Sequence, residues 1–202
     1  MKSFPVAATG ALIDLDGTLL DTAPDIAEAV NAMLVERGRE PLPLSRVAQF
    51  VGKGSEVLVH RALTDDPQGR AEPRDHAAAL ERFLHHYART NGTRAVRYPG
   101  VLEGLTALRE AGLRLACVTN KPQAFADALL ESTGLARFFA FTQGGDALPF
   151  KKPDPRPLLQ AAARLGCAPS GTVAIGDSVN DALAARAAGM TVFVVPYGYN
   201  EG

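Results

Sequence analysis

The segment ATGALIDLDGT, residues 8–18, joins a short apolar run to two aspartates that stand two positions apart. The run ends at Ile13, and Asp14, Asp16 and Gly17 follow it at once. A brief apolar run that stops at polar residues is typical of a strand buried in a parallel sheet. In an extended segment, residues i and i+2 point to the same side, so both carboxylates should face one place. The segment therefore predicts a buried strand whose carboxyl end carries a functional site.

Further apolar runs, each bounded by Gly, Pro or polar residues, predict more buried strands. They cover residues 113–119, 173–175 and 191–195. Helical patterns, with apolar residues three to four positions apart, lie between them at residues 104–111, 123–133, 156–165 and 180–188. Alternating strands and helices indicate a doubly wound, Rossmann-like parallel sheet. We therefore predict an α/β fold for the first strand together with the later part of the chain.

The segment between these parts carries helical patterns and no convincing strand. Thr22 is a candidate N-cap, and Pro24 follows in the first turn, which favours the start of a helix. The expected helices cover residues 22–37, about 45–51, a stretch from 55 onward and about 74–91, with a loop at 65–74. This pattern predicts an α/β core of residues 1–21 and 97–202, interrupted by a small helical domain of residues 22–96.

Composition limits the possible functions. Of the 202 residues, 47% are apolar, and 21 basic against 22 acidic side chains give a formal net charge of −1. This balance offers no electrostatic reason for a nucleic-acid partner. Cys117 and Cys167 have no CxxC partner, which disfavours a redox or metal role. The sequence has no stretch as apolar as a membrane span and no signal-peptide pattern at its start. We expect a cytoplasmic protein, monomeric or homodimeric, without a membrane partner.

Polar residues stand where several predicted strands end, which is where sites form in open α/β sheets. Thr119 and Asn120 end one strand, Asp177 ends another, and Lys152 follows a short apolar stretch at residues 138–141. Carboxylates that converge would repel each other unless a cation lies between them, and an oxygen-rich site suits Mg²⁺. A divalent cation, a lysine and hydrogen-bond donors together suggest a phosphoryl substrate.

The two aspartates of the first segment need separate roles in such a reaction. Asp14 can lie in line with phosphorus as the nucleophile. Asp16 can protonate the leaving oxygen and later accept a proton from the water that hydrolyses the aspartyl-phosphate. Gly17 permits a sharp turn of the chain, and the Thr18 hydroxyl can brace the loop.

Four segments resemble, in order, the four motifs of the haloacid dehalogenase superfamily. They are DLDGT at residues 14–18, VTN at 118–120, KP at 152–153 and GDSVND at 176–181. The resemblance spans almost the whole chain, and it implies that the helical segment is the family's cap domain, which closes over the substrate and excludes water.

The resemblance also implies roles for individual residues. Asp14 would be the nucleophile and a Mg²⁺ ligand, and Asp16 would be the acid/base that binds the metal through its backbone carbonyl. Thr119 and Asn120 would bind phosphate, and Lys152 would hold nucleophile and phosphate together. Asp177 would complete the set of metal ligands, and Asp181 would support them without binding the metal itself, although Asp181 could equally serve only as an acidic residue in the first turn of a helix.

Further segments resemble the bacterial phosphoglycolate phosphatases. They are VGKGS at residues 51–55, YPGV at 98–101, KKPDP at 151–155 and YGYN at 197–200. The resemblance implies a small phosphate ester, 2-phosphoglycolate, as the substrate. Lys53, between two glycines of the helical segment, could pair with the glycolate carboxylate when the cap closes, or it could be a solvated loop lysine. For Lys151 we expect only a solvated charge.

Two other functions use similar residues. A phosphomutase on the same scaffold would also need Asp14 and Asp16, with a sugar hydroxyl in place of water as the acceptor. A receiver domain, which is phosphorylated on Asp for signalling, is doubly wound as well, but it is shorter and lacks a helical insert. The chain stops at Gly202, where members of the resembled group usually continue with a strand and a helix, so we expect a shortened chain with an exposed sheet edge.

Overall fold

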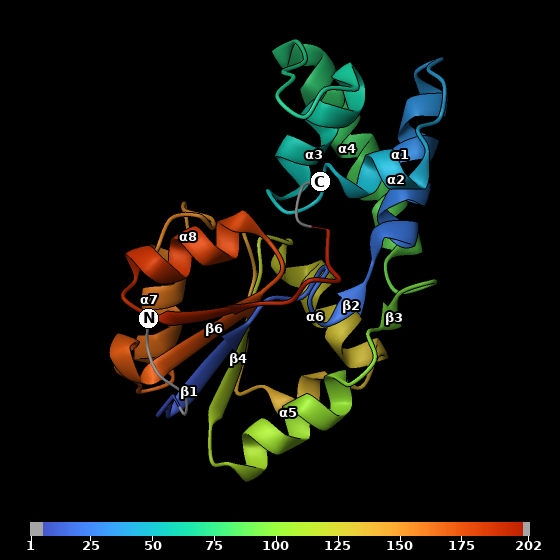
Figure 1. Ribbon diagram of the computed structural model, residues 1–202. Coiled ribbons are helices and arrows are strands. Elements are labelled where there is room, and N and C mark those ends of the chain that lie inside the picture. The colour runs from blue at the N-terminus through green and yellow to red at the C-terminus, as the bar shows by residue number, and fades with distance from the viewer. Residues whose placement is uncertain (1–5, 200–202) are drawn as a thin grey trace.

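The core of the protein is a parallel sheet with helices on both faces (Figure 1). The computed structural model describes residues 6–199, so Asn200 and Gly202 lie outside the described residues. The strand order is β5-β4-β1-β6-β7, and all four neighbouring pairs are parallel. The strands are β1 (Gly10–Ile13), β4 (Arg114–Val118), β5 (Thr142–Gln143), β6 (Thr172–Gly176) and β7 (Thr191–Val194). The predicted α/β class is confirmed.

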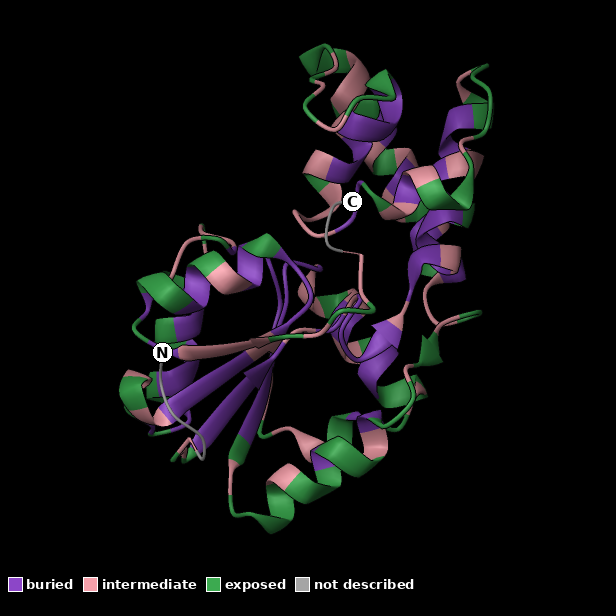
Figure 2. Cartoon of the chain, viewed as in Figure 1, coloured by how far each residue is buried: buried purple, intermediate pink, exposed green. Residues whose placement is uncertain are grey.

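Two apolar clusters attach the helices to opposite faces of this sheet. One joins α5 (Val101–Glu110) and α6 (Gln123–Ser132) to side chains of β1 such as Ile13. The other joins α7 (Arg156–Arg164) and α8 (Val179–Ala187) to the opposite side of β1 through Leu12. Short 3-10 turns at Ala136–Phe138 and Pro169–Gly171 complete the core. Because strand neighbours point to opposite faces, the apolar run of β1 contributes to both clusters. The central strands of the sheet are buried (Figure 2).

The register of the sheet brings three strand ends together. Ile13, the last residue of β1, pairs with Cys117 of β4 on one side and with Ile175 of β6 on the other. The residues that follow these strands therefore leave the sheet at the same edge. Asp14 is central at this edge because β1 is the middle strand.

A helical insert of four helices lies beyond this edge (Figure 1). It consists of α1 (Ala23–Glu36), α2 (Leu44–Ala48), α3 (Ser55–Thr64) and α4 (Pro73–Thr90). These helices pack around their own apolar cluster, which includes Met33, Phe50 and Phe83. A two-stranded ribbon of β2 (Leu20–Asp21) and β3 (Val96–Arg97) marks where the chain leaves the core and returns to it. The arrangement supports the proposal that residues 22–96 form a separate inserted domain.

The two connections to the helical insert are tied together by Asp25, a fully buried residue in the first turn of α1. Its carboxylate accepts hydrogen bonds from the backbone N–H groups of Gly92 at 2.8 Å and Arg94 at 2.7 Å, and from the Thr93 hydroxyl at 3.2 Å. A buried carboxylate that is satisfied by several donors fixes the chain around it. The start of α1 and the segment after α4 therefore hold one geometry.

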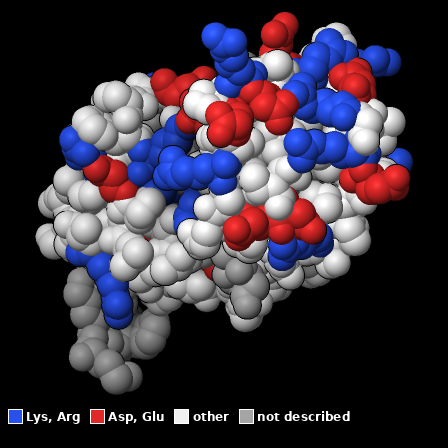
Figure 3. Space-filling model, turned by 90° about the horizontal axis from the view of Figure 1, so that it is seen from above, with Lys and Arg blue, Asp and Glu red and all other residues white. Residues whose placement is uncertain are grey.

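The helices of the insert differ from the sequence prediction in detail. α2 begins at Leu44 after Pro43 and ends at Ala48, whereas the pattern indicated residues 45–51. The strand Val96–Arg97 was not predicted, because two residues are too short to show a period. In the part of the chain that the structure describes, no helix has the length and apolar character that a bilayer crossing needs. Seen from above the helical insert, basic and acidic side chains are interspersed (Figure 3).

Candidate active site

Lys152 is buried at the centre of the candidate site. Its ammonium lies 2.8 Å from the Oδ1 atom of Asp14 and donates to Oδ1 of Asp181 at 2.7 Å and to the carbonyl oxygen of Val118 at 2.8 Å. The side chain is 3% exposed. An ammonium has three donors and tolerates burial only with such partners. The loop after β5, the end of β1 and the start of α8 therefore meet at one buried cation.

Burial and like charge act on the nucleophile candidate. Desolvation, opposed by Lys152 and reinforced by Asp181 and Asp177, raises the pKa of Asp14 to about 7. Burial alone would lower the pKa of Lys152, but Asp14 and Asp181 outweigh it, and the pKa is raised. Three carboxylates face one ammonium here, so negative charge is in excess and a further cation would relieve it.

The acidic residues of this edge could hold a divalent cation. Asp14, Asp177 and Asp181 each place one carboxylate oxygen within 4.8 Å of the others. Oδ1 of Asp14 is buried, and the Lys152 ammonium lies 2.8 Å from it. A carboxylate within reach of two further carboxylates, with one ammonium among the three, fits a hard cation that prefers oxygen ligands.

Asp177 is held in place from two sides of the chain. Its Oδ1 accepts a hydrogen bond from the Thr18 hydroxyl at 3.1 Å, and its Oδ2 accepts one from the backbone N–H of Tyr199 at 2.7 Å. Burial raises its pKa. Only glycine fits at two neighbouring positions: a Cβ atom on Gly17, where φ is +80°, or on Gly198 would come within 2.3 Å of Asp177 Oδ2. The Thr18 hydroxyl thus orients a carboxylate, beyond the predicted brace of a loop.

Asp181 combines two contacts. Besides its bond with Lys152, it forms a capping box with Ser178, in which the Ser178 hydroxyl donates to Asp181 Oδ2 at 2.6 Å. Such a box satisfies backbone donors at the first turn of a helix. The start of α8 therefore aims one oxygen of Asp181 at the cluster while the other fixes the helix.

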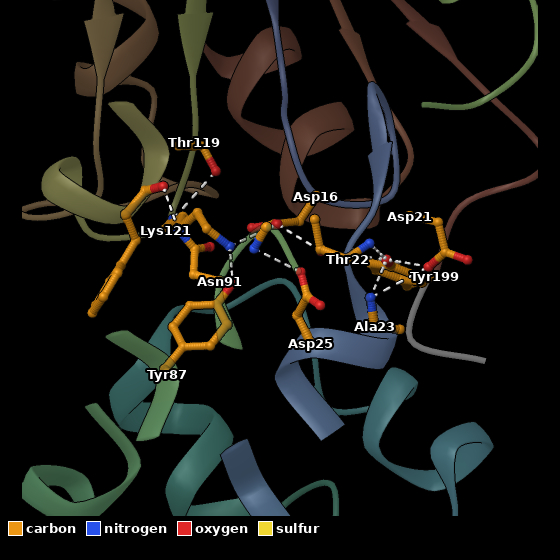
Figure 4. Close-up of polar contacts among 12 residues, drawn as sticks. Asp16, Asp21, Thr22, Ala23, Asp25, Tyr87, Asn91, Thr119, Lys121 and Tyr199 are labelled. Atoms are coloured by element: carbon orange, nitrogen blue, oxygen red, sulfur yellow. Dashed lines mark hydrogen bonds and ion pairs between the residues drawn. The ribbon is translucent and has the colours of Figure 1, made fainter. Parts of the chain in front are cut away.

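The Asp16 carboxylate points away from the acidic cluster. Its Oδ1 accepts hydrogen bonds from the Thr22 hydroxyl at 2.7 Å and from the ammonium of Lys121 at 2.9 Å (Figure 4). Lys121 also donates to the hydroxyl of Tyr87 in α4. Burial alone would lower the pKa of Lys121, but Asp16 and Tyr87 outweigh it and raise the pKa. Sequence reasoning missed Lys121, although it directly follows the predicted pair Thr119 and Asn120.

Thr119 and Asn120 stand at the end of β4, as predicted, but their side chains make local contacts. The Thr119 hydroxyl accepts a hydrogen bond from the backbone N–H of Lys121 at 3.2 Å. The Asn120 amide pairs with both backbone groups of Lys152 and donates to the carbonyl oxygen of Gly52, each at 2.9 Å. Asn120 therefore joins the core loop to the helical insert, and a phosphate-binding role for either residue stays a prediction.

A pocket of about 460 Å³, counting its open mouth, lies between the sheet edge and the helical insert. Residues from both parts line it: Asp14, Asp16, Ile26, Val51, Gly52, Gly54, Ser55, Leu58, Phe83, Tyr87, Thr119, Asn120, Lys121 and Pro122. Lys53 is not among these described lining residues, so its role stays a prediction. Lys151 is no free solvated charge, because its ammonium lies 3.1 Å from a carboxylate oxygen of Glu56 in α3.

Tyr199 replaces the side-chain cap that Thr22 was expected to give α1. The Thr22 hydroxyl bonds to Asp16 instead, and the Tyr199 hydroxyl accepts from the backbone N–H groups of Thr22 at 2.6 Å and Ala23 at 2.8 Å. It also donates to Asp21 at 2.8 Å (Figure 4). Because the backbone of Tyr199 holds Asp177 as well, this residue connects the acidic cluster to the start of the helical insert.

Comparisons with known proteins identify the family to which this chain belongs. The sequence model of the haloacid dehalogenase-like hydrolases matches residues 9–189. A phosphoglycolate phosphatase of Nitrosospira multiformis is 51% identical over 98% of this chain and 88% of its own length. One of Thiobacillus denitrificans is 46% identical over 100% of this chain and 89% of its own.

Solved structures show the same architecture. The crystal structure of a predicted phosphoglycolate phosphatase from Haemophilus somnus superposes with a TM-score of 0.89, at 31% identity over 96% of this chain and 88% of that one. CbbY from Rhodobacter sphaeroides, in complex with phosphate, shares the fold with a TM-score of 0.79 at 24% identity over 96% of this chain and 88% of that one. The motif resemblance is confirmed, and the chain belongs to the haloacid dehalogenase-like hydrolase family.

Proposed function

We propose that this protein is a Mg²⁺-dependent phosphatase that hydrolyses 2-phosphoglycolate to glycolate and phosphate through an aspartyl-phosphate on Asp14. The observation that carries the proposal is the largely buried Asp14 carboxylate, which directly follows the central strand and lies 2.8 Å from Lys152 beside two further aspartates. The relatives named phosphoglycolate phosphatase, up to 51% identical over nearly the whole chain, support the choice of substrate.

In the first step, a carboxylate oxygen of Asp14 attacks phosphorus in line with the ester oxygen. The bond between Asp14 and phosphorus forms as the bond to the ester oxygen breaks, and the leaving oxygen takes a proton from Asp16. Lys152 offsets charge on the nucleophile and on the phosphoryl oxygens, because its ammonium already lies within ion-pair distance of Asp14. Thr119 and Asn120, at the end of the neighbouring strand, would bind the phosphate.

In the second step, water attacks the phosphorus of the aspartyl-phosphate and gives its proton to Asp16, which releases phosphate and restores Asp14. The contacts of Asp16 with Thr22 and Lys121 hold its carboxylate at the pocket wall. Mg²⁺ held by Asp14, Asp177 and the Asp16 carbonyl, with Asp181 beside them, would neutralise charge on the transferred phosphoryl group.

The helical insert would act as a cap that excludes water from the aspartyl-phosphate. Its contribution to the pocket is mainly apolar, from Ile26, Leu58 and Phe83, and a dry wall strengthens the electrostatic contacts inside. Lys53 would pair with the substrate carboxylate when the cap closes. An unchanged kcat/KM for 2-phosphoglycolate in a Lys53→Ala variant would contradict that role.

The experiment that tests the proposed function is a phosphate-release assay over a panel of small phosphate esters, with Mg²⁺ and with chelator. We expect Mg²⁺-dependent release and a kcat/KM for 2-phosphoglycolate well above that for the other esters. A flat profile would contradict the substrate assignment, and folded protein that releases no phosphate from any ester would contradict the phosphatase assignment.

A further inference from the structure

Lys121 and Tyr87 meet where the core contacts the helical insert. Lys121 comes from the loop after β4, and Tyr87 comes from α4, far away in sequence (Figure 4). The Lys121 ammonium donates to the Tyr87 hydroxyl and, at 2.9 Å, to Asp16. Lys121 is 5% exposed, Tyr87 is 2% exposed, and both line the pocket. Burying an ammonium is costly unless it is paired, and the contacts with Asp16 and Tyr87 hold this one at the pocket wall.

Both side chains keep a donor in reserve. An ammonium carries three N–H donors, and within residues 6–199 Lys121 has two side-chain acceptors, Asp16 and Tyr87. The Tyr87 hydroxyl accepts from Lys121 and so keeps its own proton, for which the described residues offer no acceptor. One N–H and one O–H are therefore available to a ligand, which matches the two oxygens of a carboxylate.

The charges around the pocket add a second reason. Among the described residues that line it, Lys121 is the only cation, whereas Asp14 and Asp16 are acidic. The remaining wall from the helical insert is largely apolar, with Ile26 and Phe83. Within this described lining, the acidic side chains would repel a carboxylate and the apolar ones would leave it unpaired, so Lys121 is the side chain that offers it a counter-charge before any closure that would bring Lys53 nearer.

We infer that Lys121 and Tyr87 form a subsite for a carboxylate on the leaving group of the phosphate ester. The inference rests on the proposed function, in which Asp16 lies beside the ester oxygen. Lys121 contacts that same Asp16 carboxylate at 2.9 Å. A carboxylate one carbon away from the ester oxygen, as in 2-phosphoglycolate, then falls within hydrogen-bond reach of the ammonium. The subsite selects short phosphorylated acids over neutral esters of the same size.

The test compares two esters of similar size, 2-phosphoglycolate and 2-hydroxyethyl phosphate, whose leaving group is neutral, in the presence of Mg²⁺. The readout is the ratio of their kcat/KM values, because a change that only disturbs Asp16 or the fold lowers both rates and leaves the ratio alone. The variants are Lys121→Met, Tyr87→Phe and the matched control Lys151→Met, which changes a lysine that pairs with the exposed Glu56.

We expect the ratio to fall by about 100-fold in Lys121→Met, since a substrate carboxylate would be buried without a counter-charge. The fall should be roughly 10-fold in Tyr87→Phe, which removes one donor and keeps the ring that stacks on Phe83. The ratio should change less than about 2-fold in Lys151→Met. Tyr87→Phe keeps the inference testable if Lys121→Met does not fold.

An unchanged ratio in both Lys121→Met and Tyr87→Phe would overturn the subsite even if the rates themselves drop. A wild-type protein that cleaves neither ester would instead overturn the proposed function. The two failures are therefore distinguishable within one experiment.

Discussion

The sheet edge and the helical insert face the same pocket with different chemistry. The core supplies charged side chains that are buried and paired with one another, with Lys152 between Asp14 and Asp181. The insert supplies a largely apolar wall with the side chains of Ser55 and Tyr87 as its hydroxyl groups. The two parts therefore have different roles. The groups that must keep fixed charges and distances lie on the sheet, whereas the helical insert, which could move, places few charged side chains in the site.

The contacts that join the two parts differ in burial. The contact of Lys121 with Tyr87 is buried, whereas the pair of Lys151 and Glu56 is exposed, with the Glu56 side chain 65% accessible. Buried charge contacts are costly to break, and exposed pairs contribute little. Substitutions of buried, charged residues in the core should therefore reduce activity or stability most, and substitutions of exposed residues should reduce them least.

The largest effect should come from Asp14→Asn. We expect kcat for 2-phosphoglycolate to fall by about 10⁴-fold or more, because an amide is a poor nucleophile for phosphorus. The fold should persist, since the change removes a buried carboxyl group whose pKa is raised by desolvation. Phosphate release and thermal unfolding measured on the same sample check both parts, and retained turnover would refute the assignment of Asp14.

The next effect should come from Lys152→Met, measured as stability. Removing this ammonium leaves the buried Asp181 and the largely buried Asp14 without their counter-charge, which should cost about 3–5 kcal/mol of unfolding free energy in metal-free protein. Adding Asp14→Asn to this variant should recover part of the loss, since it removes one of the repelling carboxylates. Urea denaturation of both variants measures the effect, and a loss under about 1 kcal/mol for Lys152→Met would contradict the pairing.

Removing Mg²⁺ should lower the stability of the protein more at higher pH than at lower pH. The pKa of Asp14 is raised from 3.8 to about 7 in the metal-free fold. Its contribution to stability is therefore full below its unfolded pKa and is lost as the pH rises through about 7, by on the order of 4 kcal/mol. Mg²⁺ favours the charged form, so it should raise the melting temperature more near pH 8 than near pH 5. Thermal unfolding with Mg²⁺ or chelator at both pH values tests this, and Asp14→Asn is the control that should lose the difference.

A smaller effect is expected for Tyr199→Phe. The change removes the hydroxyl that accepts from Thr22 and Ala23 and donates to Asp21. Loss of a helix cap typically costs about 1 kcal/mol, and the backbone bond from residue 199 to Asp177 remains. Denaturation should show this loss of unfolding free energy. Steady-state kinetics should show a larger change in KM than in kcat. A variant as stable as wild type would show that the hydroxyl does not hold the start of α1.

The smallest effect is expected for Glu56→Gln. The ion pair with Lys151 is exposed, and such pairs contribute about 0–1 kcal/mol. At moderate salt, the free energy of unfolding should change by less than about 1 kcal/mol, and kcat should change by less than about 2-fold. A large fall in kcat would mean that this contact controls closure of the helical insert, which would weaken the contrast between buried and exposed contacts.

The sequence predicted the α/β core better than the contacts between the core and the helical insert. β1, β4 and β6 follow from apolar runs between polar residues, and the site residues at their ends follow from the geometry of parallel sheets. Asp14 and Asp177 therefore meet where expected. These predictions succeed because local pattern and global topology agree for buried strands.

The contacts between the core and the helical insert could not be predicted in the same way. Lys121 finds Tyr87 across a long stretch of chain, and the Tyr199 hydroxyl caps a helix that begins near the other end of the sequence. Such contacts have no period and no fixed spacing, so one sequence gives no signal for them. Thr22 is an example: its position at the start of α1 was predicted correctly, but its hydroxyl donates to Asp16 and does not cap the helix.

The most direct test of the account is to trap the phosphorylated enzyme. With an ester whose leaving group needs no acid, such as p-nitrophenyl phosphate, Asp16→Asn should slow hydrolysis of the intermediate more than its formation. Acid quenching during turnover of that ester, followed by peptide mass spectrometry, should then find one phosphoryl group on the peptide that contains Asp14. Asp14→Asn in the same protocol should show none. A phosphoryl group on any other residue, or product formation with no trapped intermediate at any time point, would contradict Asp14 as the nucleophile.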